Sequence, residues 1–159
     1  MAIPAFDAAT GVLPVGRHAA DVMEIEARLV VAFAASSTRR LIFNWWLEHR
    51  KAVAEFIPVF QQWIDGSFVE AKNDPADVDL VTFFGGAGYD ALPPHRKQIV
   101  NMLMANKRTQ QFWQCDSYPV AVYPGTHPMF PKYLSARAYW DNWFGHTRSL
   151  TPKGYIEVL

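Results

Sequence analysis

The fold is decided by one stretch of sequence: Gly66-Ser67-Phe68-Val69-Glu70-Ala71-Lys72-Asn73-Asp74-Pro75-Ala76-Asp77-Val78-Asp79-Leu80. Residues i and i+2 of a strand point to the same face, so Asp77 and Asp79 can each give an oxygen to one Mg²⁺, or to two ions about 4 Å apart. Nine residues separate Asp77 from the preceding Gly66-Ser67 pair, which offers backbone N–H groups and a hydroxyl that suit a triphosphate. Phosphoryl or nucleotidyl transfer needs this combination, and the stretch therefore predicts an NTP site.

Apolar runs bounded by turn residues predict strands around this stretch. The strongest is Val78–Phe84, which begins between the two acids and is followed by glycines. A shorter strand, Gln61–Asp65, runs into the Gly-Ser pair as a tight turn. Cys115–Tyr123 is expected to be a third strand, and Pro119 places it near a sheet edge or a bulge because proline cannot donate to the ladder. A last strand is expected at Gly154–Leu159.

Helical periodicity precedes and separates these strands. Asp21 and Glu24 form a capping-box pattern for a helix over residues 21–35, and a second helix follows Ser36–Thr38 and should end or kink at Pro58. On the polar face of that second helix we expect charged residues, namely Arg39, Arg40, Glu48, Arg50 and Lys51. Two more helices are expected, one from Pro93-Pro94 through about Asn106 and one around Ser135–Phe144.

Helices come first and strands follow with helices between them, which indicates an α+β (α/β-like) class. We expect a small mixed sheet flanked by helices, with two helices near the N-terminus. Residues 6–17 carry glycine and proline and are expected to be irregular, within an N-terminal arm over residues 1–20. No repeat or linker divides the chain, so residues 1–159 are expected to form a single domain.

Composition excludes several classes of protein. The 159 residues contain 15 Lys and Arg against 15 Asp and Glu, and half of them are apolar, unlike a disordered polyampholyte. Zero net charge removes the global basic field of a dedicated nucleic-acid binder, though not a local basic patch. The longest apolar run, Leu29–Ala35, is far short of the ~20 residues that cross a bilayer, and Met1–Asp7 lacks signal-peptide features. A soluble, cytoplasmic protein that does not enter membranes is expected.

The Gly66-Ser67 to Asp77-Val78-Asp79 spacing resembles the signature of polymerase β-type nucleotidyltransferases, in which a strand ending in Gly-Ser precedes a strand bearing Asp-x-Asp. The whole chain is similar to an uncharacterised prokaryotic nucleotidyltransferase-like family linked to mobile elements and toxin–antitoxin-like loci. The segments that carry this likeness are Gly11–Gly16, Trp45-Trp46, Gly66–Val69, Lys72–Asp79 and Lys153-Gly154.

The resemblance implies a metal site made of three acids. Asp77 and Asp79 would bind Mg²⁺ or Mn²⁺, and Asp116, on a later strand, is the candidate third acid that would also help to deprotonate the acceptor. Gly66 and Ser67 would hold the β- and γ-phosphates. The cations expected near the nucleotide are Lys72, Arg148 and Lys153, for each of which a solvated surface position is the alternative.

Several residues suit ordinary structural roles. The acids of residues 74–79 taken alone also suit a solvated loop, and Asp74, before Pro75, is expected to form a turn. The histidines show no metal-ligand spacing, and the lone Cys115 alternates with Asp116 and should point into the core. An aromatic cluster at helical spacing is expected to be core or lid packing, with a base-stacking platform as the alternative: Tyr139, Trp140, Trp143 and Phe144.

Two functions of different class follow. The first is a metal-dependent enzyme that moves a nucleoside monophosphate from an NTP to a protein side chain or an RNA 3′ end, in a toxin–antitoxin or phage-defence setting. Neutral charge favours the protein acceptor, because RNA substrates usually need a larger basic surface. The second is a catalytically weak antitoxin or regulatory module, whose apolar helices at Leu29–Ala35 and Ile42–Phe60 would also pack a partner. Metal-dependent nucleotide binding distinguishes the two.

Overall fold

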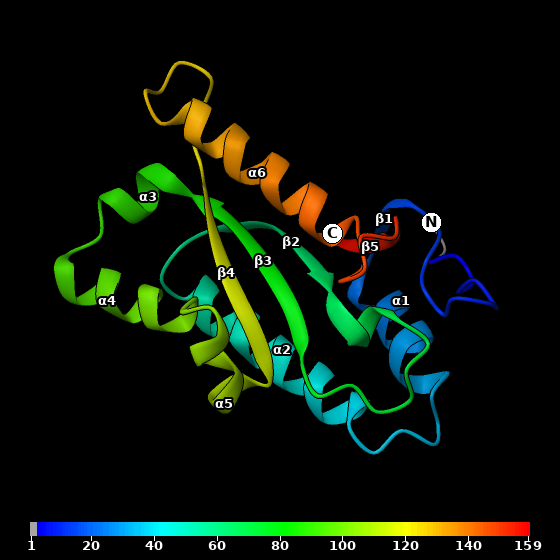
Figure 1. Cartoon of the computed structure of the whole chain (residues 1–159). Coiled ribbons are helices and arrows are strands. Elements are labelled where there is room, and N and C mark those ends of the chain that lie inside the picture. The colour runs from blue at the N-terminus through cyan, green and yellow to red at the C-terminus, as the bar shows by residue number, and fades with distance from the viewer. Residues whose placement is uncertain (1–2) are drawn as a thin grey trace.

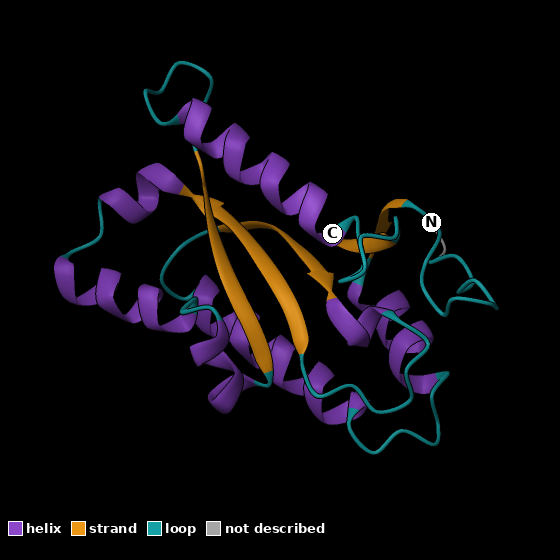
Figure 2. Cartoon of the chain, viewed as in Figure 1, coloured by secondary structure: helices purple, strands orange, loops and turns teal. Residues whose placement is uncertain are grey.

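The computed structural model describes residues 3–159 and contains a five-stranded sheet (Figure 2). Its strands are β1 Gly16–Ala20, β2 Val59–Asp65, β3 Val78–Gly85, β4 Cys115–Val122 and β5 Gly154–Val158. They lie in the order β1-β5-β2-β3-β4. The pairs β1–β5 and β3–β4 are parallel, whereas β2 is antiparallel to both β3 and β5. The expected α+β class with a mixed sheet is confirmed.

The helices and helical turns form two groups along the chain, the first before β3 and the second after it. The first group comprises α1 Val22–Glu26, the π-helical turn η1 Ala27–Val31, α2 Arg39–Ala54 and the 3₁₀ turn η2 Gly66–Val69. The second comprises α3 Gly86–Asp90, α4 Pro94–Leu103, the 3₁₀ turn η3 Lys107–Thr109, α5 Gln110–Trp113 and α6 Phe130–Phe144.

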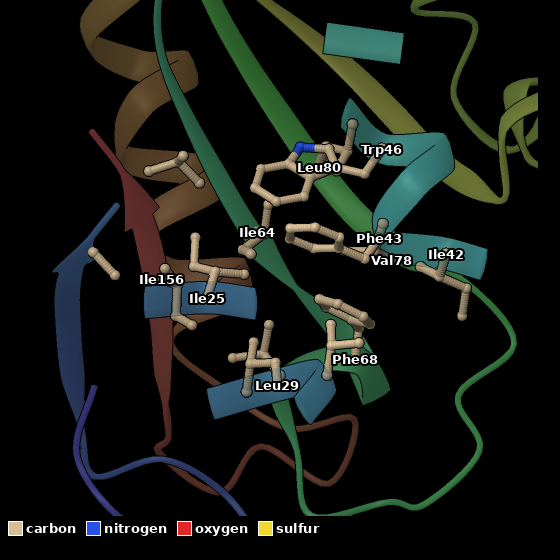
Figure 3. Packing of buried hydrophobic residues seen from close by; sticks show 14 of the residues in the cluster. Ile25, Leu29, Ile42, Phe43, Trp46, Ile64, Phe68, Val78, Leu80 and Ile156 are labelled. Atoms are coloured by element: carbon tan, nitrogen blue, oxygen red, sulfur yellow. The ribbon is translucent and has the colours of Figure 1, made fainter. Parts of the chain in front are cut away.

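Alternation along the strands produces an apolar layer on each face of the sheet. On one face α1, η1 and α2 pack on β2, β3 and β5, as Figure 3 shows. That layer includes Ile25, Leu29, Ile42, Phe43, Trp46, Ile64, Leu80 and Ile156. On the other face α6 lies across the sheet and buries a second layer (Figure 1), whose members are Trp63, Val81, Phe83, Val120, Phe144 and Tyr155.

The N-terminal part differs most from the sequence expectation. The described part of the expected arm contains β1, which pairs in register with β5 from Gly16↔Gly154 to Ala20↔Val158. The five residues of β1 are small or charged and show no alternation, so only the distant C-terminal strand specifies their pairing. The helix expected over residues 21–35 starts at Val22 with the Asp21 cap, but its α-helical part ends at Glu26 and continues as η1. Residues 1–2 of the expected arm lie outside the described residues.

The later elements agree better, with shifted ends. β4 is an edge strand, as Pro119 predicts. The tight turn expected at Gly66-Ser67 is a 3₁₀ turn, and α4 ends at Leu103, before Asn106. The aromatic helix begins at Phe130, so it is longer than expected. The short helices α3 and α5 were not predicted, because four or five residues carry too little periodicity.

The strand directions bring three strand ends together. Since β2 is antiparallel to β3 and β4 is parallel to it, β2 ends where β3 and β4 begin. Figure 1 shows these ends on one side of the sheet, with α5 beside the start of β4. Within residues 3–159, no helix is both long and apolar enough to cross a membrane.

Candidate functional site

A row of carboxylates crosses three strands at this end of the sheet. Asp65 of β2 pairs with Asp79 of β3, and Asp79 pairs with Asp116 of β4. Paired residues on adjacent strands point to the same face and their strands lie about 4.8 Å apart. The alternating neighbours Ile64 and Cys115 point into the opposite layer, which confirms the expected core position of Cys115. Asp79 and Asp116 are therefore neighbours on the face that α6 partly covers.

Asp77 lies just before β3, where its Oδ2 accepts a hydrogen bond from Nε2 of Gln110. Burial first, and then the negative charges of Asp77 and Asp116, raise the pKa of Asp79 to about 6. The pKa of Asp116 is also raised, first by burial and then by Asp77. Burial raises the pKa of Asp77, against the opposing charge of Arg148. The structure thus brings the three predicted acids into one electrostatically coupled group.

The chemistry of this group fits a divalent cation. Oδ1 of Asp116 is buried and has no hydrogen-bond partner among residues 3–159, which is costly for a carboxylate oxygen unless a cation or donor satisfies it. Carboxylates are ligands that Mg²⁺ and Mn²⁺ favour. Within residues 3–159, no three His, Cys, Asp or Glu side chains already form a metal-binding group. The carboxylates would therefore have to turn toward one another to share an ion.

Gly66 touches this group through its backbone. Its φ is +76°, a conformation that glycine adopts without strain. A Cβ at this position would overlap Oδ2 of Asp79 and lie 3.2 Å from its Cγ. Glycine is needed here because the chain turns directly against the Asp79 carboxylate, and Ser67 follows in the same half-buried turn.

Lys153 lies beside Asp65, at the β2 end of the row of carboxylates. It is buried, with only 3% of its surface exposed. Its Nζ bonds Oδ1 of Asp65 at 2.5 Å and Oε1 of Glu70 at 3.4 Å. Burial raises the pKa of Asp65 to about 7, and the Lys153 charge opposes that rise. The sequence predicts a nucleotide-binding role for Lys153, and it does not reveal Asp65 and Glu70 as the ion-pair partners of this lysine. The one available signal was the position of Asp65 directly before Gly66.

The other two predicted cations are exposed. Arg148 lies in the loop after α6, close enough for its charge to lower the pKa values of Asp77 and Asp79. Lys72 lies in the connection between η2 and β3, and its charge also lowers the pKa of Asp77. Both side chains remain available to an anionic ligand beside the acids.

Arg39 supports the connection between η2 and β3, although the sequence predicts this residue on the polar face of a helix. Arg39 is fully buried at the start of α2, contrary to that expectation. It uses all three nitrogens as donors: Nη1 bonds the carbonyls of Leu29 (2.9 Å) and Phe68 (2.7 Å), Nη2 bonds those of Glu70 (2.7 Å) and Lys72 (2.6 Å), and Nε bonds that of Lys72 (3.3 Å). Three of the four carbonyl partners, in residues 68–72, lie about thirty positions away in the sequence, which no helical pattern reveals.

Asp74 anchors the same connection through bonds to distant residues and not through the local turn that the sequence predicts. Its Oδ1 accepts bonds from the backbone N–H of Ser37 (2.7 Å) and from the hydroxyls of Ser36 and Ser37 (3.1 Å each). These bonds tie the connection to the turn before α2. Asp74 is therefore a structural residue, and its oxygen is used away from the three acids.

The aromatic cluster of α6 is divided. Phe144 is buried and Trp140 packs beside it, which confirms the core interpretation for these two. Tyr139 and Trp143 are exposed and stack on each other with centroids 6.1 Å apart. Tyr118, two residues after Asp116, packs on Trp140 at 4.5 Å, so α6 forms one wall next to the acids.

Comparison with known proteins gives a family match over nearly the whole chain. The model of a family of unknown function (DUF6932) matches residues 4–159. No curated protein and no solved structure matches the chain significantly.

Proposed function

We propose that the chain, which belongs to this family of unknown function, is a metal-dependent nucleotidyltransferase. It would move a nucleoside monophosphate from an NTP to an acceptor hydroxyl. The observation that carries this proposal is the pairing of Asp79 with Asp116, with Gly66 turning directly against Asp79. Coupled acids beside a glycine turn suit phosphate chemistry, which depends on charge neutralisation and close backbone approach.

The three acids would hold Mg²⁺ or Mn²⁺. When bound, such an ion neutralises charge on the phosphates and on the reacting oxygens. Asp77 and Asp79 supply carboxylate oxygens from one strand end, and Asp116 supplies the buried oxygen that has no other partner. Burial and then mutual repulsion raise the pKa of Asp79, and a bound cation would relieve the energetic cost of keeping these carboxylates charged.

The NTP phosphates would bind at the Gly66 turn. Backbone N–H groups and the Ser67 hydroxyl would face the β- and γ-phosphates, and the exposed Lys72 and Arg148 would add positive charge. Lys153 would act from its buried ion pair, where its ammonium holds Asp65 beside Asp79. A direct phosphate bond from Lys153 would require this pair to open.

The proposed transfer forms one bond and breaks one. The acceptor oxygen bonds the α-phosphorus, while the bond from that phosphorus to the oxygen bridging the α- and β-phosphates breaks. Pyrophosphate leaves with the electron pair of the broken bond. The proton of the acceptor hydroxyl passes to the Asp116 carboxylate, and orientation of the reactants supplies much of the rate.

The acceptor and the cellular setting come from the resemblance. A protein side chain and an RNA 3′ end are both compatible with the transfer. If the protein acts in a toxin–antitoxin, phage-defence or mobile-element setting, the acceptor would be its partner protein or the RNA of that partner. Because the proposed reaction consumes NTP, we propose that the protein acts in the cytoplasm.

The proposal is tested by nucleotide binding, which also separates an enzyme from a scaffold. Calorimetry with each NTP and Mg²⁺ should show binding that EDTA abolishes. Asp77→Asn should weaken it at least about tenfold, because an amide carries no net charge to hold the ion. Glu55→Gln, which neutralises an exposed acid of the C-cap of α2, is the matched control and should bind as wild type. If wild type binds no NTP with either metal, the chain is a binding module and the enzyme proposal fails.

A further inference from the structure

A second polar feature adjoins the acids. A pocket of about 580 Å³ opens between the residue before Asp77 and the segment that leads into β4. Its lining is cationic and amide-rich, and consists of Ala76, Lys107, Arg108, Gln110, Gln111 and Gln114. Gln110 belongs to both features, because its Nε2 also bonds Asp77. Any ligand in the pocket therefore lies next to the proposed metal-binding acids.

Two cations in the pocket lining are not held in ion pairs. Lys107 and Arg108 are exposed, and neither forms an ion pair with the described part of the chain, residues 3–159. The positive charge of Lys107 opposes the rise in the pKa values of Asp77 and Asp116, so Lys107 lies near both acids. Two exposed cations without ion-pair partners can attract the phosphates of an anionic ligand.

The segment that presents these side chains is held firmly. It is bracketed by two non-glycine residues with positive φ, Asn106 at 58° and Gln114 at 52°. The backbone N–H of Asn106 bonds the carbonyl of Ser117, and the hydroxyl of Thr109 accepts from the N–H of Ser117. At the other end, Trp113 packs against Trp45 with ring centroids 5.9 Å apart. A fixed segment presents its cations and amides without a large ordering cost.

The same short helix exposes an aromatic ring. Phe112, next to Gln111, has 66% of its surface exposed. A site for single-stranded nucleic acid combines three features: cations that bind phosphates, amides that bind base edges and an exposed ring on which a base stacks. An acidic peptide would use the cations alone and would leave the amides and the ring without a role.

We propose that this pocket binds a single-stranded nucleic acid, whose terminal hydroxyl is the acceptor. The proposal rests on the proposed transfer only for the role of that hydroxyl. The phosphates of the NTP would occupy the Gly66 turn at the β2 side of Asp79, whereas the pocket lies at the β4 edge, beyond Asp77. The acids thus stand between a site for the donor and a site for the acceptor.

The test measures binding without catalysis. Fluorescence anisotropy in EDTA would compare a short single-stranded RNA, a DNA of the same sequence and an acidic peptide of matched charge. The variant Lys107→Ala/Arg108→Ala removes two phosphate contacts. At about 0.1 M salt this should weaken nucleic-acid binding about 25-fold, from a slope of about −0.7 per contact in log K against log salt. Phe112→Ala should weaken it about 5-fold or more.

The matched control is Arg28→Ala/Lys132→Ala, which removes one exposed arginine and one exposed lysine outside the pocket and should bind as wild type. Equal losses in the two double variants would indicate nonspecific charge attraction and overturn the proposal. Preference for the peptide, or no binding of either oligonucleotide, would overturn it as well. Comparison of the RNA and DNA arms shows which sugar the site takes. Binding that is intact without any NTP transfer would refute the proposed function and leave the pocket's ligand established.

Discussion

Gly66 is the residue at which the chain and the metal-binding acids come closest. Its positive φ and the overlap of any Cβ with the Asp79 carboxylate make two separate demands on this position. We predict that Gly66→Ala displaces the Asp79 side chain and costs about 1–3 kcal/mol of stability, and that Mg²⁺-dependent NTP binding is lost in calorimetry.

Gly11→Ala is the control for backbone strain alone. Gly11 has nearly the same φ, +72°, but a Cβ there would meet Ala71 Cβ at an acceptable 3.4 Å. This variant should lose a similar amount of stability and keep nucleotide binding. NTP affinity that is unchanged in Gly66→Ala would remove the turn from the site.

Asp79 gives the stability of the metal-free protein a defined pH dependence. Its folded pKa, about 6, lies above its unfolded value near 3.8, so the folded state prefers the protonated carboxyl. This contribution of Asp79 to the free energy of unfolding is complete below about pH 4 and is lost as the pH rises through about 6. In EDTA at pH 8, Asp79→Asn should therefore be more stable than wild type, by at most about 3 kcal/mol, and at pH 4 nearly equal.

Thermal unfolding at the two pH values checks this prediction. Glu55→Gln, which neutralises an exposed acid outside the row of carboxylates, should show no such stabilisation. A melting temperature of Asp79→Asn that falls at pH 8 would mean that the carboxylate is structural, and the enzyme proposal would lose its main support.

At the scale of elements, α2 holds the connection between η2 and β3 through Arg39. Arg39→Met would leave the buried carbonyls of Leu29 and Phe68, and those of Glu70 and Lys72, without their donor. We predict a loss of about 3 kcal/mol or more in urea unfolding, together with faster amide exchange over residues 66–77.

The neighbouring exposed Arg40, which pairs with Glu26, provides the comparison. Arg40→Met should cost no more than about 1 kcal/mol, because a surface ion pair contributes little. Equal losses for Arg39→Met and Arg40→Met would contradict the role of the buried guanidinium.

The elements also show what local pattern can and cannot predict. The strand at Cys115 and the edge position of Pro119 follow from alternation and from proline's missing N–H, whereas the place of Asp116 beside Asp79 is an expectation of the family resemblance. The pairing of β1 with β5, the Asp65–Lys153 ion pair and the Arg39 bonds each join residues far apart in sequence. Each depends on packing that no local periodicity encodes.

In the whole molecule, an apolar layer covers part or all of each face of the sheet, and one end of the sheet remains polar. The α2 face is filled by aliphatic and aromatic residues, and α6 covers only part of the other face. The acids, the Gly66 turn and the cationic pocket all lie where β2 ends and β3 and β4 begin. This concentration of charge at one sheet end is the basis of the proposed chemistry.

The most direct measurement compares NTP labelled at the α-phosphate with NTP labelled at the γ-phosphate, each incubated with Mg²⁺, total RNA and cell extract. We expect that α-label alone passes to a macromolecule, that pyrophosphate is released, and that EDTA or Asp79→Asn abolishes the transfer. Transfer of γ-label, or α-label transfer that persists in Asp79→Asn with the same acceptor, would contradict it.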